Sequence, residues 1–112
     1  MLHCTTTKQN DATVLRLNGR LDATTAPAFE QECQKRIVGG EIRLIVDFAD
    51  VSYISSAGLR SILSTAKRLK QNQGTIAVCG LQGMVEEVFT VSGFSAYLPV
   101  FTSVDEALAA AC

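Results

Sequence analysis

The sequence predicts a single α/β domain with a mixed, mostly parallel sheet of four to five strands and about four helices. Short apolar runs rich in β-branched residues alternate along the chain with amphipathic helical segments, and the connections between them are short. Such alternation favours βαβ units and hence parallel strands. A length of 112 residues, with 47% hydrophobic and 19% charged residues, suits one globular domain, which we expect to span residues 1–112.

The first third of the chain predicts a hairpin followed by a helix. Residues Thr13–Gly19 alternate as a strand does, and Leu2–Lys8 are expected to pair with them as an edge strand across the turn-forming Gln9–Asp11. The helix is expected to begin near Pro27, which a first helical turn tolerates, and to end at Gly39–Gly40. Three residues mark its apolar face by their spacing: Phe29, Cys33 and Ile37.

The middle of the chain predicts a buried strand and a long helix. Residues Ile42–Phe48 are apolar on both faces, as expected of a central strand that is covered on both sides. The helix after it ends at Gly74, and its apolar face consists of Leu59, Ile62, Leu63, Ala66 and Leu69. Four cations lie largely off that face, three of them in the last turns, where they suit the helix dipole: Arg60, Lys67, Arg68 and Lys70.

The last third repeats the pattern of a strand followed by a helix. Residues Thr75–Cys79 predict a strand, and a helical stripe over Met84–Phe89 follows and is interrupted at Gly93. A short strand around Leu98–Phe101 leads into Ser103–Glu106, where the serine-to-glutamate spacing is that of a capping box. We therefore expect a short terminal helix.

Composition excludes several classes of function. Ten Lys and Arg against eleven Asp and Glu leave no field that would attract nucleic acid or anionic lipid. No apolar stretch approaches the roughly 18 residues that span a bilayer, so we expect a cytoplasmic protein without membrane insertion. The four cysteines, Cys4, Cys33, Cys79 and Cys112, form no C-x-x-C pair and accompany one histidine, so we expect free, mostly packed thiols, no metal and no cofactor.

An enzyme is also not expected. No pair of a nucleophile and a base is apparent, because His3 lies alone near the terminus. The chain lacks a glycine-rich phosphate loop of the kinds that bind nucleotides. The sequence therefore predicts a binding protein without catalytic residues.

One segment combines features that point to a functional site. Residues Asp47–Leu59 pass from a buried strand through a polar turn into a helix start, where Ser55 and Ser56 meet unpaired backbone N–H groups. Either serine can cap the helix, which is worth roughly 1 kcal/mol. A phosphoserine is also tolerated there, because a helix N-terminus favours anions. Arg60, one turn after Ser56, either supplies a cation to that phosphate or is a solvated surface arginine.

Over most of its length, from about Thr13 to Ala110, the chain resembles the anti-sigma-factor antagonists of the STAS family. Four motifs carry the resemblance through their order and spacing: Gly19–Pro27, Leu44–Phe48, Val51–Leu59 and Phe89–Phe94. In that family a serine in an Asp-Ser-Ser-Gly-Leu type of turn is phosphorylated by the anti-sigma factor, which is itself a kinase. The resemblance implies a STAS-like fold for the whole chain.

Placing Gly58 and the following leucine on the family's Gly-Leu implies that Ser56 is the phosphoacceptor. Ser55 then stands where the family usually has aspartate, which makes Ser55 a competing acceptor and departs from the family pattern. The resemblance places Asp22 beside the switch serine, where it helps to contact the kinase, while its residue type equally suits a helix cap. Asp47 matches a family position near the serine, and site and structural roles are both open for it.

The resemblance also implies a mechanism. The unphosphorylated protein binds the anti-sigma factor kinase, frees the sigma factor, and loses affinity once Ser56 is phosphorylated, so regulating transcription. A PP2C-type phosphatase would reset the switch. The alternative is a non-switching STAS module that serves as a scaffold or as a subunit associated with a transporter.

Overall fold

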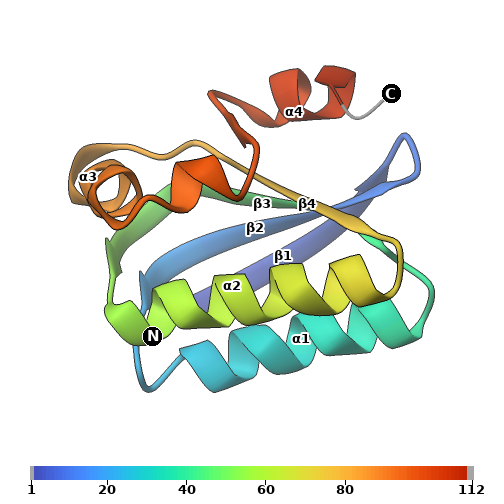
Figure 1. Ribbon diagram of the computed structural model, residues 1–112, viewed down its shortest axis with the longest axis horizontal. Coiled ribbons are helices and arrows are strands. Elements are labelled where there is room, and N and C mark those ends of the chain that lie inside the picture. Colours follow the sequence, from blue (N-terminus) through green and yellow to red (C-terminus); the bar gives the residue numbers. More distant parts are fainter. Residues whose placement is uncertain (1, 111–112) are drawn as a thin grey trace.

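The computed structural model describes residues 2–110, and Met1, Ala111 and Cys112 lie outside the described residues. The elements follow one another as β1 (Leu2–Gln9), β2 (Ala12–Leu21), α1 (Ala26–Val38), β3 (Arg43–Ile54), α2 (Ser56–Gln71), β4 (Thr75–Cys79), α3 (Gly83–Ser92), the 3-10 turn η1 (Phe94–Ala96), β5 (Val100–Phe101) and α4 (Val104–Ala110). The predicted fold class is confirmed, because these elements form a mixed five-stranded sheet with four helices (Figure 1).

The strands lie in the sheet in their sequence order, with β3 at the centre as predicted. β1 and β2 are antiparallel, and the three remaining neighbouring pairs are parallel. The hairpin turns at Asn10 and Asp11, whose φ angles of 52° and 65° are ones that Asn and Asp tolerate better than most residues. The predicted edge hairpin is therefore confirmed.

Helices cover the two faces of the sheet unequally (Figure 1). α1, α2 and α3 pack on one face over the larger core, in which the rings of Phe48 and Phe89 meet edge to face with centroids 5.6 Å apart. α4 covers part of the other face through a smaller cluster of Ala12, Val14, Ile45, Cys79, Ala107 and Leu108. The first half of β3 is thus buried on both faces, which explains its continuous apolar run.

β3 extends further than its sequence predicts. The expected end was Phe48, whereas the strand continues to Ile54 and pairs with β2 up to the contact of Leu21 with Ile54. Beyond Phe48 only one face is covered, so buried Val51 and Ile54 alternate imperfectly with exposed polar residues. Register shifts between β2 and β3 blur the alternation further, so the polar residues resemble a turn in the sequence.

The last predicted strand is shorter than expected. Only Val100 and Phe101 pair with β4, whereas the expected strand began around Leu98. Leu98 instead lies buried in the larger core, two residues after the end of η1. Its apolar side chain contributed to the strand pattern although its backbone lies outside the sheet.

The described cysteines are free thiols, and two of them fill the core as predicted. Cys33 of α1 and Cys79 of β4 are buried, and burial raises the pKa of each thiol to about 12. Cys4 on β1 is exposed as a residue. Neighbouring groups still partly desolvate its thiol, and this raises its pKa. The fourth, Cys112, lies outside the described residues.

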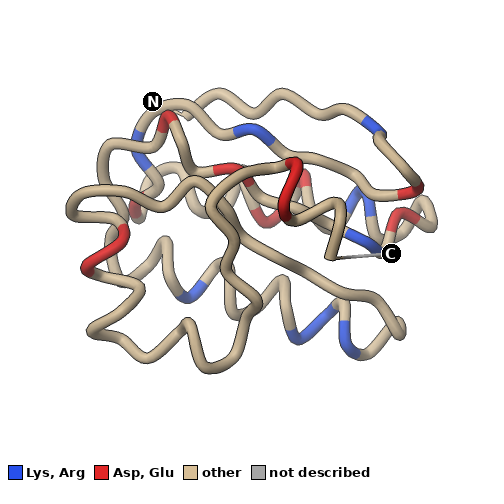
Figure 2. The backbone as a smooth tube through the Cα atoms, turned by 90° about the horizontal axis from the view of Figure 1, so that it is seen from above, with Lys and Arg blue, Asp and Glu red and all other residues tan. Residues whose placement is uncertain are grey.

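Ion pairs between described side chains involve three arginines of β2 and α1. Nε of Arg36 lies 2.8 Å from Oε2 of Glu32, one helical turn earlier, and Nη1 of Arg36 lies 3.6 Å from Oε2 of Glu41. The second pair ties α1 to the segment just before β3. The other two ion pairs are made by Arg16 and Arg20 of β2. In Figure 2 both signs of charge are interspersed in the upper part, and basic residues lie without acidic neighbours at the lower right.

Within residues 2–110 no helix is long and apolar enough to cross a membrane.

The first turn of α2 approaches the end of β2 closely at Gly58. A Cβ atom on Gly58 would lie 2.5 Å from the carbonyl oxygen of Leu21 and 3.0 Å from Cγ1 of Ile54. Ser55 reinforces the approach, because its backbone N–H donates to the same Leu21 oxygen at 3.0 Å. A glycine is therefore required for the start of α2 to pack against β2.

We expect the substitution Gly58→Ala to lower the free energy of unfolding by about 1–3 kcal/mol, because the added methyl group overpacks the contact with Leu21. Urea unfolding measures the loss. The matched control is Gly39→Ala, where the new Cβ would lie 3.5 Å from the nearest carbonyl oxygens and φ is −77°. The control should be neutral or slightly stabilising. Equal stability of the two variants would contradict the close approach.

Candidate functional site

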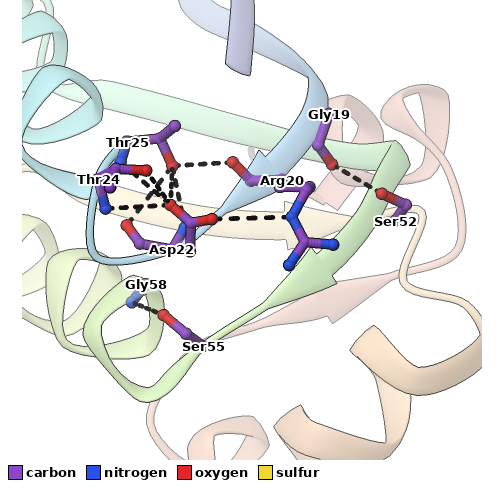
Figure 3. A network of polar contacts seen from close by, with 8 residues as sticks. All are labelled: Gly19, Arg20, Asp22, Thr24, Thr25, Ser52, Ser55 and Gly58. Atoms are coloured by element: carbon purple, nitrogen blue, oxygen red, sulfur yellow. Dashed lines mark hydrogen bonds and ion pairs between the residues drawn. The ribbon is translucent and has the colours of Figure 1, made fainter. Parts of the chain in front are cut away.

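Two loops lie side by side at the carboxyl ends of β2 and β3. The two parallel strands end together, with Leu21 opposite Ile54. The loop after β2 contains Asp22 and leads into α1, while the loop after β3 consists of Ser55 and leads into α2 (Figure 3). Loops that a rigid sheet positions in this way commonly carry binding residues. The structure thus brings Asp22, Ser55 and the start of α2 together as candidate site residues.

Ser55 caps α2. Its backbone is extended, with φ −100° and ψ 173°, and its hydroxyl oxygen accepts a hydrogen bond from the N–H of Gly58 at 3.2 Å. Its carbonyl oxygen accepts the N–H of Leu59 at 2.9 Å, the first bond of the helix. The capping role that the sequence left open for either serine therefore belongs to Ser55.

Ser56 is the first residue inside α2, and it is exposed. Its hydroxyl has no hydrogen-bond partner among the described residues, in contrast to that of Ser55. The first turn of α2 contains no acidic residue, so the helix dipole and the free N–H groups there favour an anion attached to Ser56. The hydroxyl is accessible from solvent, and an anion on it would be stabilised by the helix.

Arg60 follows Ser56 by one helical turn and is exposed. No acidic side chain of the described residues forms an ion pair with it. Together with Ala57, Arg60 lines the end of a groove between α1 and α2. Its guanidinium is therefore solvent-exposed and free of ion pairs with the described residues.

The Asp22 carboxylate folds the loop that leads into α1 (Figure 3). Oδ1 accepts hydrogen bonds from the backbone N–H of Thr24 at 3.0 Å, from the Thr24 hydroxyl at 2.7 Å and from the N–H of Thr25 at 3.2 Å. Oδ2 lies 3.7 Å from Nε of Arg20. The hydrogen bond from the Thr24 hydroxyl, followed by those of the backbone N–H groups, lowers the pKa of Asp22.

Asp22 is not the N-cap of α1, which is Thr25. The carboxylate acts one turn earlier, as an acceptor that closes the loop, and the Asp22 carbonyl oxygen accepts the N–H of Ala26 at 2.8 Å. Its structural role is thus visible. Its contact with a partner stays a prediction.

We expect the Asp22 carboxylate to stabilise the fold at neutral pH and to lose this effect in acid. Its pKa in the folded protein lies below the ordinary value of 3.8, so its contribution is present above that pH and disappears as the pH falls through the folded pKa. Urea unfolding of the wild type and of Asp22→Asn between pH 7 and pH 3 tests this. The wild type's advantage should shrink below about pH 4. An advantage that is constant over this range would contradict the assignment.

Asp47 lies away from the two serines. It sits within β3, and at about 3.3 Å per residue the strand carries it roughly 20 Å from Ile54. Its Oδ1 accepts the N–H of Ala49 at 3.0 Å, and Oδ2 lies 3.7 Å from Nε of Arg16. A Cβ on Gly80 would lie 2.7 Å from Oδ1, so the end of β4 packs against this carboxylate. The sequence left a site role and a structural role open for Asp47, and these contacts support the structural one.

Sequence reasoning missed two neighbours of the site. The guanidinium of Arg20 stacks over the ring of Tyr53 at 4.2 Å from its centroid and reaches Asp22 at the same time. Arg20 and Tyr53 are paired across β2 and β3 only because a register shift brings them opposite each other. No spacing in the sequence signals that pair.

Within residues 2–110, no group of three His, Cys, Asp or Glu side chains is arranged to hold a metal ion.

The two serines should differ in their effect on stability. We expect Ser55→Ala to lower the free energy of unfolding by about 1 kcal/mol, because the Gly58 N–H loses its acceptor and α2 loses its cap. Ser56→Ala should lower it by less than about 0.5 kcal/mol. Ser55→Asp should retain most of the stability, since aspartate is an equally good N-cap. Urea unfolding of the three variants measures these differences. A larger cost for Ser56→Ala than for Ser55→Ala would reverse the assignment of the cap.

The pattern of the STAS domain matches residues 3–107, and the chain belongs to this family. It is 42% identical over 94 residues to BtrV of Bordetella bronchiseptica, which is provisionally named an anti-sigma factor antagonist, with 84% of this chain and 81% of BtrV covered. It is 28% identical over 92 residues to the anti-sigma-B factor antagonist of Staphylococcus aureus, with 82% of this chain and 85% of that protein covered.

A solved structure shares the fold. The phosphorylated form of SpoIIAA, a cell fate determinant of Bacillus, superimposes with a TM-score of 0.76 at 20% sequence identity. The superposition covers 98% of this chain and 100% of SpoIIAA. The STAS-like fold expected from the sequence is thereby confirmed, and the resemblance to anti-sigma factor antagonists holds for relatives that match most of the chain.

Proposed function

We propose that this protein is an anti-sigma factor antagonist that binds an anti-sigma factor kinase and is switched off by phosphorylation of Ser56. One observation carries the proposal: the Ser56 hydroxyl is exposed and without a hydrogen bond at the start of α2, while its neighbour Ser55 is engaged as the cap. The names of the relatives support the binding role, and the phosphorylated form of SpoIIAA supports a switch on this fold. This role belongs in the cytoplasm, where sigma factors act.

The chain supplies the acceptor, and the kinase supplies the catalysis. The Ser56 hydroxyl oxygen attacks the γ-phosphorus of ATP bound to the kinase, the bond to the ADP oxygen breaks, and the hydroxyl proton passes to a base of the kinase. An attack in line with the leaving oxygen requires a hydroxyl that is accessible on the surface of the protein. Ser55 is a poorer acceptor, because its phosphorylation would disturb the hydrogen bond to the Gly58 N–H.

The phosphate acts through local electrostatics. It adds about −1.5 to −2 charges, which an interface shaped for a neutral hydroxyl accommodates only at the cost of desolvation and repulsion. A loss of 2.7 kcal/mol in binding corresponds to roughly a hundredfold weaker affinity. The fold itself need not change, because the start of α2 favours an anion. A PP2C-type phosphatase would restore the binding form.

Phosphate mapping tests the acceptor. The purified protein is incubated with its cognate anti-sigma factor and ATP, and the phosphorylated residue is identified by mass spectrometry. We expect one phosphate on Ser56 and none on Ser56→Ala, whereas Ser55→Ala should still be modified. Phosphate on Ser55 alone would refute the Ser56 assignment, and binding without any phosphorylation would indicate a non-switching STAS scaffold.

Ser56→Asp separates the switch from a structural role. We expect this variant to bind the anti-sigma factor more weakly by an order of magnitude or more, about 1.4 kcal/mol, and to keep a melting temperature close to that of the wild type. The threonine variant Ser56→Thr is the matched control, since it retains a neutral hydroxyl. A large fall in melting temperature for Ser56→Asp would show that the first turn of α2 does not tolerate the charge.

A further inference from the structure

α2 is the one helix of residues 2–110 that is strongly basic. It holds four of the chain's ten basic residues and none of its eleven acidic ones: Arg60, Lys67, Arg68 and Lys70. All four are exposed, and none forms an ion pair within the described part of the chain. A protein with a net charge of −1 thus presents an unneutralised basic surface on one element.

Two grooves flank this helix. The groove between α1 and α2 has a volume of about 830 Å³, and the basic side chains of Arg60, Lys67 and Arg68 line it together with Ala26 and Ala57. Its single acidic residue is Glu30 on the α1 side. This groove reaches Ala57, which directly follows Ser56.

The second groove runs between α2 and the segment around η1. It has a volume of about 620 Å³ and an apolar lining that includes Phe94, Tyr97 and Leu98, with Lys67 and Lys70 at its rim. Tyr97 is 76% exposed, which is unusual for a large aromatic residue. Leu63 and Lys67 line both grooves, so α2 forms a ridge between two partly apolar channels.

We propose that an acidic amphipathic segment of the anti-sigma factor docks along α2, with carboxylates on its four cations and apolar side chains in the two grooves. This inference rests on the proposed function and names the chemistry of the partner. The cations span the eleven residues from Arg60 to Lys70, about 15 Å of helix, which a partner segment of about eleven helical residues would match. Charge complementarity would also accelerate association and make it sensitive to salt.

A protein segment fits this surface better than nucleic acid does. The channels between the cations are lined by alanine, leucine and aromatic side chains, which accept apolar side chains rather than phosphates. The acidic residues all lie on the rest of the molecule, including Glu30 within the first groove, and would repel a long polyanion. A short acidic segment with apolar residues matches both properties.

The position of the groove couples docking to the switch. Arg60 lies at its end and one turn from Ser56, so a phosphate on Ser56 and a partner carboxylate would compete for the same guanidinium. The phosphate would also repel the acidic segment. Phosphorylation would therefore weaken docking along α2 as well as contacts at Ser56 itself.

Cross-linking of zero length tests the contact directly. A water-soluble carbodiimide joins a lysine amine to a carboxylate through an amide bond, and the lost water converts the reagent into its urea. With the anti-sigma factor bound, we expect mass spectrometry to find Lys67 or Lys70 joined to Asp or Glu of the partner. Lys8 and Lys35, which lie on β1 and α1, are internal controls. Cross-links from these two lysines alone would overturn the proposal.

Charge reversal measures the contribution to binding. We expect the variant Lys67→Glu/Arg68→Glu to bind the anti-sigma factor at least tenfold more weakly at low salt, about 1.4 kcal/mol, with a smaller salt dependence. The control Lys8→Glu/Lys35→Glu changes the net charge equally and should bind within about twofold of the wild type. Circular dichroism melting checks the folding of both variants.

The outcomes separate this inference from the function on which it rests. Equal binding by the two charge-reversal variants and the wild type would overturn docking along α2 and leave the proposed function intact. No binding by the wild type would overturn both. Displacement of the anti-sigma factor by an equimolar random-sequence DNA duplex would favour a nucleic acid as the occupant of α2 and would equally overturn the proposal.

Discussion

The contact between the start of α2 and the end of β2 determines the geometry of the candidate site. The Leu21 carbonyl oxygen accepts the N–H of Ser55, and Gly58 allows the helix backbone to come within reach of the same oxygen. Ser55 then caps the helix, which leaves Ser56 as its first exposed residue. A displacement of this contact would move the Ser55 cap, the Ser56 hydroxyl and the adjoining groove together.

Hydrogen bonds hold the site on both sides. The Asp22 carboxylate closes the neighbouring loop through four hydrogen bonds from Thr24 and Thr25, which form without any partner. Since little conformational entropy remains to be lost there, a kinase would meet a preformed surface. A phosphate on such a surface changes its charge rather than its shape, which agrees with a switch that works by local electrostatics.

Much of this arrangement follows from local patterns in the sequence. The hairpin at Asn10–Asp11, the buried run that begins β3 and the hydroxyl-bearing start of α2 all arise from residue types at short spacing. The end of β3 did not follow, because only one face is covered beyond Phe48 and its register against β2 shifts. Because the strand runs on to Ile54, Asp47 lies within the sheet and at a distance from the two serines.

The sequence by itself determined the fold class, the family resemblance and the two serines at a helix start, since these depend on periodicity and on neighbouring residues. Only the tertiary structure decided which serine is the cap. That choice depends on the position of Gly58 against Leu21, which are far apart in the chain. The pairing of Arg20 with Tyr53 and the two grooves beside α2 likewise exist only once strands and helices pack, because contacts between distant residues carry no local signal.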